Sequence, residues 1–78
     1  MSDHLAKEAE RLKHDEIFNM ALDRIRAEAL EGLALTDADD ITAILKLQCR
    51  VFAVDEIRST LDAYIMAADV QENPGSFA

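Results

Sequence analysis

The pattern of apolar and polar positions is most regular from Thr36 to Ala68, where it predicts one long helix. Apolar residues recur there at alternating intervals of three and four, and Arg58 is the one polar interruption. Neither glycine nor proline occurs between Leu33 and Asn73. At 1.5 Å per residue, the helix should run roughly 50 Å. Further apolar residues widen its stripe: Ile41, Leu45, Phe52, Ile57 and Tyr64.

The residues before this stripe carry the signals of a helix start. Thr36 is the expected N-cap, with its hydroxyl accepting a hydrogen bond from an amide of the first turn. Asp39 follows three residues later, as in a variant of the capping box. The aspartates at positions 37, 39 and 40 would also suit the positive end of the helix dipole. The expected long helix therefore spans about 37–69.

An earlier apolar pattern predicts another helix, at about residues 3–31. The pattern is weak up to Lys13 and strong from Ile17, and Asp15 is positioned to cap a restart between the two parts. Gly32 occupies the place where a C′ residue in the left-handed conformation would end the helix. A connection of about five residues between two long helices is typical of an antiparallel αα-hairpin.

The sequence thus predicts an all-α fold, an antiparallel two-helix hairpin within residues 1–70, followed by a flexible tail at 71–78. Each apolar stripe is wider than one neighbouring helix can cover. We therefore expect the hairpin to form a homodimeric four-helix bundle or a larger oligomer, or to dock on another protein. The expected interaction seam consists of Phe18, Leu22, Ile25, Ala29, Ile44, Leu47, Val51, Val54, Arg58, Leu61 and Ile65.

Arg58 is the unusual member of this seam, because it stands at a core-type position. A polar residue there can fix the register or the oligomeric state, or extend its charge to the edge of the interface. Its expected partner is Asp62 one turn on, or Asp55 of a second chain. An equally good interpretation is that the seam drifts, so that Ile57 takes the inward position.

Composition limits the classes of function. The net charge of −8 argues against a grip on nucleic-acid phosphates and is compatible with a basic protein partner. The single cysteine, Cys49, excludes an intrachain disulfide, fits a reducing compartment and has no histidine base near it in the pattern. No stretch approaches the ~20 apolar residues that span a bilayer, and the first residues are charged throughout, so we expect a cytoplasmic protein.

No group of residues matches a catalytic, cofactor-binding or metal-binding signature. His4 and His14 are the only histidines, whereas a metal site needs three or four converging ligands. The aspartates of 37–40 resemble the start of a calcium loop, but Thr42 and Gln48 occupy the positions of its glycine and its bidentate glutamate. We therefore expect a protein that is not an enzyme and has neither cofactor nor metal.

Two parts of the chain resemble known proteins. The bend, Leu35-Thr36-Asp37-Ala38-Asp39, is similar to that of the RNA-binding helical-hairpin protein of ColE1-type plasmids, although the basic and aromatic stripe of that family is not evident here. The segments at 15–18, 21–26 and 54–58 resemble small helical proteins from the late, virion-gene region of tailed phages and prophages. This second resemblance implies a head, connector or assembly accessory protein, in the host cytoplasm or the virion, with no catalytic residues.

The sequence therefore favours an adaptor that acts through helix–helix contacts between proteins. One alternative is an acidic inhibitor or regulator of a basic host protein, with nucleic-acid mimicry as one way in which it could bind. A mimic should carry regular rows of carboxylates, whereas here they gather at the bend, with Glu28 and Glu31 next to the aspartates of 37–40. A nucleic-acid-binding bundle is the third class. Its phosphate contacts would have to come from Arg24, Arg26, Lys46, Arg50 and Arg58.

Overall fold

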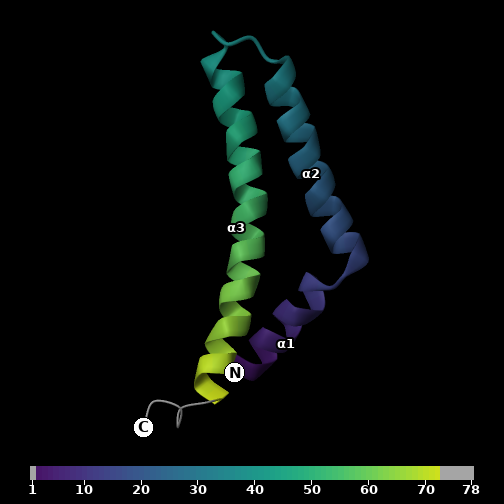
Figure 1. Ribbon diagram of the computed structural model, residues 1–78, viewed down its shortest axis with the longest axis vertical. Helices are drawn as coiled ribbons and strands as arrows, with labels where there is room; N and C mark the ends of the chain where they lie inside the picture. Colours follow the sequence, from purple (N-terminus) through teal and green to yellow (C-terminus); the bar gives the residue numbers. More distant parts are fainter. Residues whose placement is uncertain (1, 73–78) are drawn as a thin grey trace.

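The computed structural model describes residues 2–72, and that part of the chain is all-α, as predicted. It contains three helices, α1 (Ser2–Lys13), α2 (Glu16–Leu35) and α3 (Ile41–Glu72). α2 runs beside one half of α3 in the opposite direction, and α1 crosses the other half (Figure 1). α1 and α2 both pack on α3 and have little contact with each other. The long helix is thus the element that holds the other two in place.

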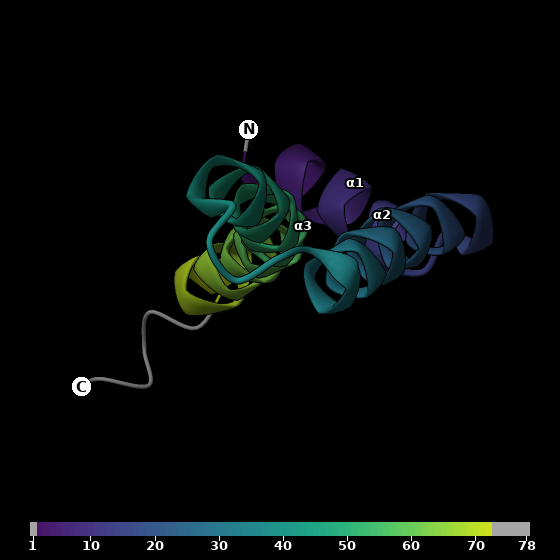
Figure 2. The ribbon, with the colours of Figure 1, turned by 90° about the horizontal axis from the view of Figure 1, so that it is seen from above.

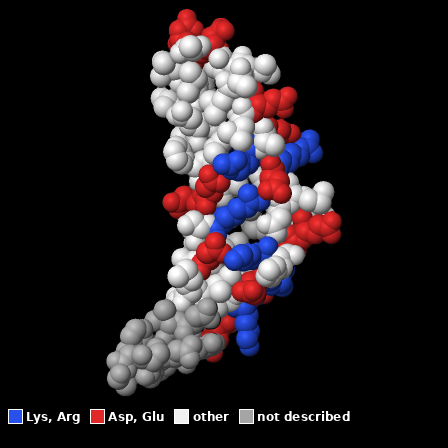
Figure 3. Space-filling view, in the orientation of Figure 1, with Lys and Arg blue, Asp and Glu red and all other residues white. Residues whose placement is uncertain are grey.

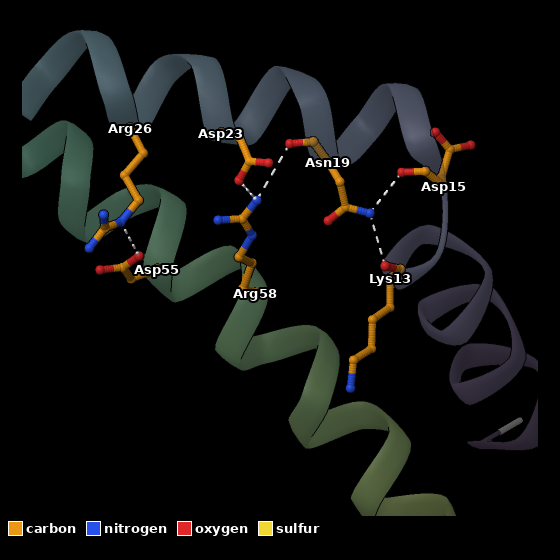
Figure 4. A network of polar contacts seen from close by, with 7 residues as sticks. All are labelled: Lys13, Asp15, Asn19, Asp23, Arg26, Asp55 and Arg58. Atoms are coloured by element: carbon orange, nitrogen blue, oxygen red, sulfur yellow. Dashed lines mark hydrogen bonds and ion pairs between the residues drawn. The ribbon is translucent and has the colours of Figure 1, made fainter.

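A break at His14 and Asp15 divides what the sequence predicted as one helix over 3–31, so that prediction was wrong. The restart cap at Asp15 is confirmed, because its carboxylate accepts a hydrogen bond from the Phe18 amide at 2.7 Å. The side-chain amide of Asn19 donates to the carbonyl oxygens of Lys13 at 2.9 Å and Asp15 at 2.7 Å (Figure 4). Asn19 therefore gives the Lys13 carbonyl oxygen a donor across the break. It adds a second donor to the Asp15 carbonyl oxygen, which also accepts from the Asn19 backbone amide at 3.0 Å.

The end of α2 also differs from the prediction. The helix continues through Gly32 to Leu35, and no glycine of the described chain has a positive φ. A Cβ at position 32 would lie 3.1 and 3.2 Å from the two methyl carbons of Leu47. The glycine therefore allows α2 and α3 to approach closely. Thr36 ends α2 instead of starting the next helix, since its hydroxyl donates to the Gly32 carbonyl oxygen at 2.6 Å.

α3 begins at Ile41, later than the predicted 37, and its cap is Asp40. One carboxylate oxygen of Asp40 accepts from the Ala43 amide at 3.2 Å, and its carbonyl oxygen accepts from the Ile44 amide at 3.1 Å. The prediction failed because four of the five residues from Thr36 to Asp40 are good caps. At its other end α3 continues to Glu72, past the predicted end at 69. The rest of the tail predicted at 71–78 lies outside the described residues.

The core is small because the helices form a thin layer. The molecule measures 56 × 28 × 17 Å, and a helix with its side chains is about 10–12 Å across. Seen from above, α2 and α3 lie side by side and α1 rests against one side of the pair (Figure 2). Large parts of every helix therefore face solvent. The buried apolar residues are Ala9, Leu22, Ala29, Val54 and Ala68.

Candidate interaction surface

The residues of the predicted seam lie at different depths. Leu22, Ala29 and Val54 are buried, whereas Ile25 has 45% of its surface exposed. The half-buried members are Phe18, Ile44, Leu47, Val51, Arg58, Leu61 and Ile65. Much of the seam is therefore used within the chain, where α2 packs on α3. Most of the exposed large apolar residues lie outside the seam.

Among the described residues, three ion pairs connect α3 to the other two helices. Their atoms lie 2.6–3.0 Å apart in the pairs Arg26–Asp55, Arg58–Asp23 and Lys13–Asp62. On α3 the sign of the charge alternates along one side of the helix, from Asp55 to Arg58 to Asp62. We call this row the ion-pair ladder, and two of its pairs are shown in Figure 4. Because each acid faces a base, the ladder defines how α1 and α2 are aligned along α3.

Arg58 is the central residue of the ladder. Its Nη2 donates to Asp23 at 2.6 Å and reaches the Asn19 carbonyl oxygen at 3.5 Å. The predicted pairing with Asp62 was wrong, since Asp62 binds Lys13 and Asp55 binds Arg26. The alternative in which Ile57 takes the inward position is also wrong, because Ile57 is exposed while Arg58 is half-buried. The sequence pattern could not reveal Asp23 as a partner on another helix.

Two exposed cations have pKa values raised by neighbouring carboxylates. A hydrogen bond to Asp62, and then the charge of that carboxylate, raise the pKa of Lys13 above its ordinary value. The pKa of Arg24 is raised in the same way by Glu28, whose carboxylate lies 2.9 Å away. Both shifts favour the charged form of the base.

Many large apolar side chains remain exposed. Single exposed apolar residues are normal on a protein surface, but contiguous groups usually mark a contact site. The described residues of this kind are Leu5, Ile17, Met20, Ile25, Leu30, Leu35, Ile41, Leu45, Phe52, Ile57, Tyr64 and Met66. They outnumber the buried core residues and are mostly larger, so the chain exposes more bulky apolar side chains than it buries.

One contiguous group lies near the bend between α2 and α3, and we call it the bend patch: Leu30, Ile41, Leu45, Gln48 and Phe52. On α3 its members follow one another at intervals of four, three and four, which places them on one side of the helix. Leu30, Gln48 and Phe52 line a groove of about 190 Å³ between the two helices, together with Leu33 and Val51. Phe52, at the edge of this groove, has 68% of its surface exposed.

The charge distribution separates this patch from the ladder. Figure 3 shows an almost uncharged region near the bend, bounded by acidic residues at the tip and by a mixed band of acidic and basic residues across the middle. The sequence showed these apolar residues only as a widening of the stripe on α3. The direction from which α2 approaches, which decides their exposure, depends on the close packing at Gly32 and on the ladder.

The described side chains that could bind a metal or act as a nucleophile do not come together. His14 contacts only Glu10 among acidic side chains, at 3.2 Å, and within the described chain no three potential metal ligands come together. Cys49 is exposed beside Lys46 and Arg50 on α3. None of the described helices is long and apolar enough to cross a bilayer.

The basic residues that a nucleic-acid complex would need are largely engaged with carboxylates. Arg24 binds Glu28, Arg26 binds Asp55 and Arg58 binds Asp23. Phosphate binding through these three side chains would have to compete with the existing ion pairs. Together with the net charge of −8, this disfavours a nucleic-acid interface.

Comparisons with protein-family models, curated proteins and solved structures found no match to this chain.

Proposed function

We propose that this protein is a non-enzymatic structural or assembly adaptor that works by helix–helix contact and self-associates through its exposed apolar surface. In this proposal the chain is an antiparallel helical hairpin that pairs with a second copy as a four-helix bundle or joins a larger oligomer. The observation that carries it is an imbalance within the described residues. The few buried apolar side chains, three of them alanines, are outnumbered by exposed Leu, Ile, Met, Phe and Tyr side chains. In a layer this thin, only association with another molecule can cover the exposed apolar side chains.

The resemblance of segments 15–18, 21–26 and 54–58 to small proteins of tailed-phage late regions supports a narrower form of this proposal. The adaptor would then be a head, connector or assembly accessory of a phage or prophage, and would contact a second protein as well as itself. Genes for virion proteins on both sides of its own gene would support this form. Neighbouring defence or repressor genes would instead favour an acidic regulator of a host protein.

The decisive experiment is the absolute mass in solution, measured by light scattering over a dilution series, with helicity measured by circular dichroism. We expect a dimer or larger oligomer that remains helical. A fully helical monomer at every concentration would contradict self-association. A monomer of low helicity would mean that a different protein covers the apolar surface and stabilises the helices.

A further inference from the structure

We propose that the bend patch is the contact between two copies of this chain, in which α3 packs antiparallel on α3 of the second copy about a two-fold axis near Gln48. This inference rests on the self-association proposed above and specifies its geometry. An interface with two-fold symmetry uses the same surface on both copies, so that surface has to be complementary to itself. Three properties fit the bend patch to this role: it belongs to one continuous face, its residues are suitably spaced along α3, and the charges around it are complementary.

The first argument is the continuity of one face. Residues one turn apart are neighbours on a helix surface. Leu30 follows Arg26 by one turn on α2. On α3, Phe52 precedes Asp55 by one turn. Since Arg26 and Asp55 bind each other at 3.0 Å, the patch and the ladder lie on the same side of the molecule. This face therefore offers apolar contacts near the bend and a row of charges beyond them.

The second argument is the spacing along α3. If two α3 helices cross antiparallel at Gln48, residues whose numbers add to about 97 lie opposite each other. Leu45 of one copy then meets Phe52 of the other, twice by symmetry. The groove beside Phe52 is lined by apolar side chains and Gln48, so it accepts an aliphatic side chain. Gln48 lies at the centre, where its amide can donate to and accept from its own symmetry copy.

The third argument is electrostatic, and it selects the antiparallel arrangement. A parallel pairing would bring two acidic bends together, each with exposed Asp37, Asp39 and Asp40, and like charges held side by side repel. In the antiparallel pairing, the start of α3 in one copy, preceded by Asp39 and Asp40, lies near the level of Arg58 of the other. Arg58 uses one of its guanidinium nitrogens for the bonds to α2, and its side chain is 34% exposed. A second carboxylate can therefore approach it.

Cross-linking at chosen positions tests this geometry directly. In a Cys49→Ser background, Gln48→Cys should form a disulfide-linked dimer under mild oxidation, because the two copies of position 48 face each other. Ser59→Cys in the same background is the matched control, since it is also exposed on α3 but lies roughly 30 Å from its symmetry copy in an antiparallel pair. Cross-linking at 48 but not at 59 is the expected result.

The other outcomes overturn the inference in distinguishable ways. Efficient cross-linking at both positions would indicate a parallel pair. Cross-linking at neither position, in a protein that light scattering shows to be a dimer, would place the interface on another face and leave the proposed self-association standing. A helical monomer at all concentrations would overturn both proposals together.

A charge placed in the patch provides a second, independent measurement. Phe52→Glu should weaken dimerisation on the order of a hundredfold, because a carboxylate would be buried between the copies without a partner. Ile17→Glu is the control, because Ile17 on α2 is 72% exposed, close to the 68% of Phe52, and lies outside the patch. Helicity should remain high in both variants at concentrations where the control is a dimer. Equal dimer affinity in the two variants would rule out the bend patch as the interface.

Discussion

The two halves of the α2–α3 pair are held together in different ways. Near the bend, the helices touch through the close approach of Gly32 to Leu47, and apolar side chains remain exposed around the contact. Farther from the bend, the ion-pair ladder joins α3 to both partners, and α1 adds a third helix. The first half is thus apolar and thinly covered. The second half contains most of the buried residues and the ion pairs, although Ile17, Met20 and Met66 are exposed there as well.

The apolar contacts and the ion pairs therefore have different roles: the first stabilise the packing of the helices, and the second align them. Exposed ion pairs contribute only about 0–1 kcal/mol each, so the ladder supplies little of the stability, although it disfavours sliding of one helix along another. The buried apolar residues, Leu22, Ala29 and Val54 among them, supply the attraction. The bend patch is apolar, and no other part of the described chain covers it. A surface with these two properties is suited to contact with another molecule.

The largest expected effect comes from placing a charge in the shared core. Val54 is 2% exposed, and Val54→Asp would bury a carboxylate without a partner. We expect a loss of about 3–5 kcal/mol, enough to unfold a chain of this size. Circular dichroism and a urea titration would measure it. Ala53→Asp, one residue along on the exposed side, should remain folded, and comparable unfolding of both would contradict the assignment of the core.

A bulkier side chain at the close approach should separate the helices of the bend half. Gly32→Leu would force Leu47 and the helix behind it outward, at an expected cost of about 1–3 kcal/mol. Gly32→Ala is the matched control, because the gain in helix propensity, about 1 kcal/mol, offsets the small shift that Leu47 must make. Thermal unfolding would rank the three proteins. A Gly32→Leu variant as stable as the wild type would show that the helices do not meet there.

Loss of one ladder pair should have a smaller effect. Arg58→Met keeps the apolar stem but removes the bond to Asp23, and we expect a loss of about 1 kcal/mol or less, since the Arg58 side chain is 34% exposed. A double-mutant cycle with Asp23→Asn isolates the pair from other effects. A coupling energy of zero would mean that the pair does not form in solution.

The smallest effect concerns the pair Lys13–Asp62 and its dependence on pH. The hydrogen bond to Asp62 raises the pKa of Lys13, so the pair's stabilisation is fully present below the ordinary lysine value of 10.5 and is lost as the pH rises through the higher folded value. Melting temperatures across this alkaline range should therefore fall less in Lys13→Gln than in the wild type. Lys7→Gln, on the same helix, is the control and should keep the wild-type slope.

The sequence predicted well those features that depend on neighbouring residues. Helical periodicity identified the helical regions, and Asp15 was correctly expected to cap a restart. Choices among equivalent local signals were less successful. Thr36 and Asp40 can both cap a helix, and only the position of α2 determines that Thr36 closes one helix and Asp40 opens the next. Gly32 looked like a terminator because the need for space opposite Leu47 does not appear in the local sequence.

The candidate surface was harder to foresee for the same reason. The periodicity of α3 showed a wide apolar stripe, but a stripe does not say which of its edges a neighbour covers. The cross-helix partners Asp23 and Arg58 are far apart in the sequence, and their pairing decides which edge stays open. Self-association, phage origin and the role as an adaptor stay predictions that the proposed experiments can test.

The break at His14 and Asp15 has a consequence for how the molecule opens. Because α1 is a separate helix with few contacts to α2, we expect that its detachment from α3 would leave the α2–α3 contacts in place. The two units should then exchange their amide hydrogens at different rates, with α1 opening first and the amides around Val54 last. Hydrogen exchange measured by mass spectrometry on peptides from α1 and α3 would show this hierarchy. Uniform protection would mean that the three helices unfold as one cooperative unit.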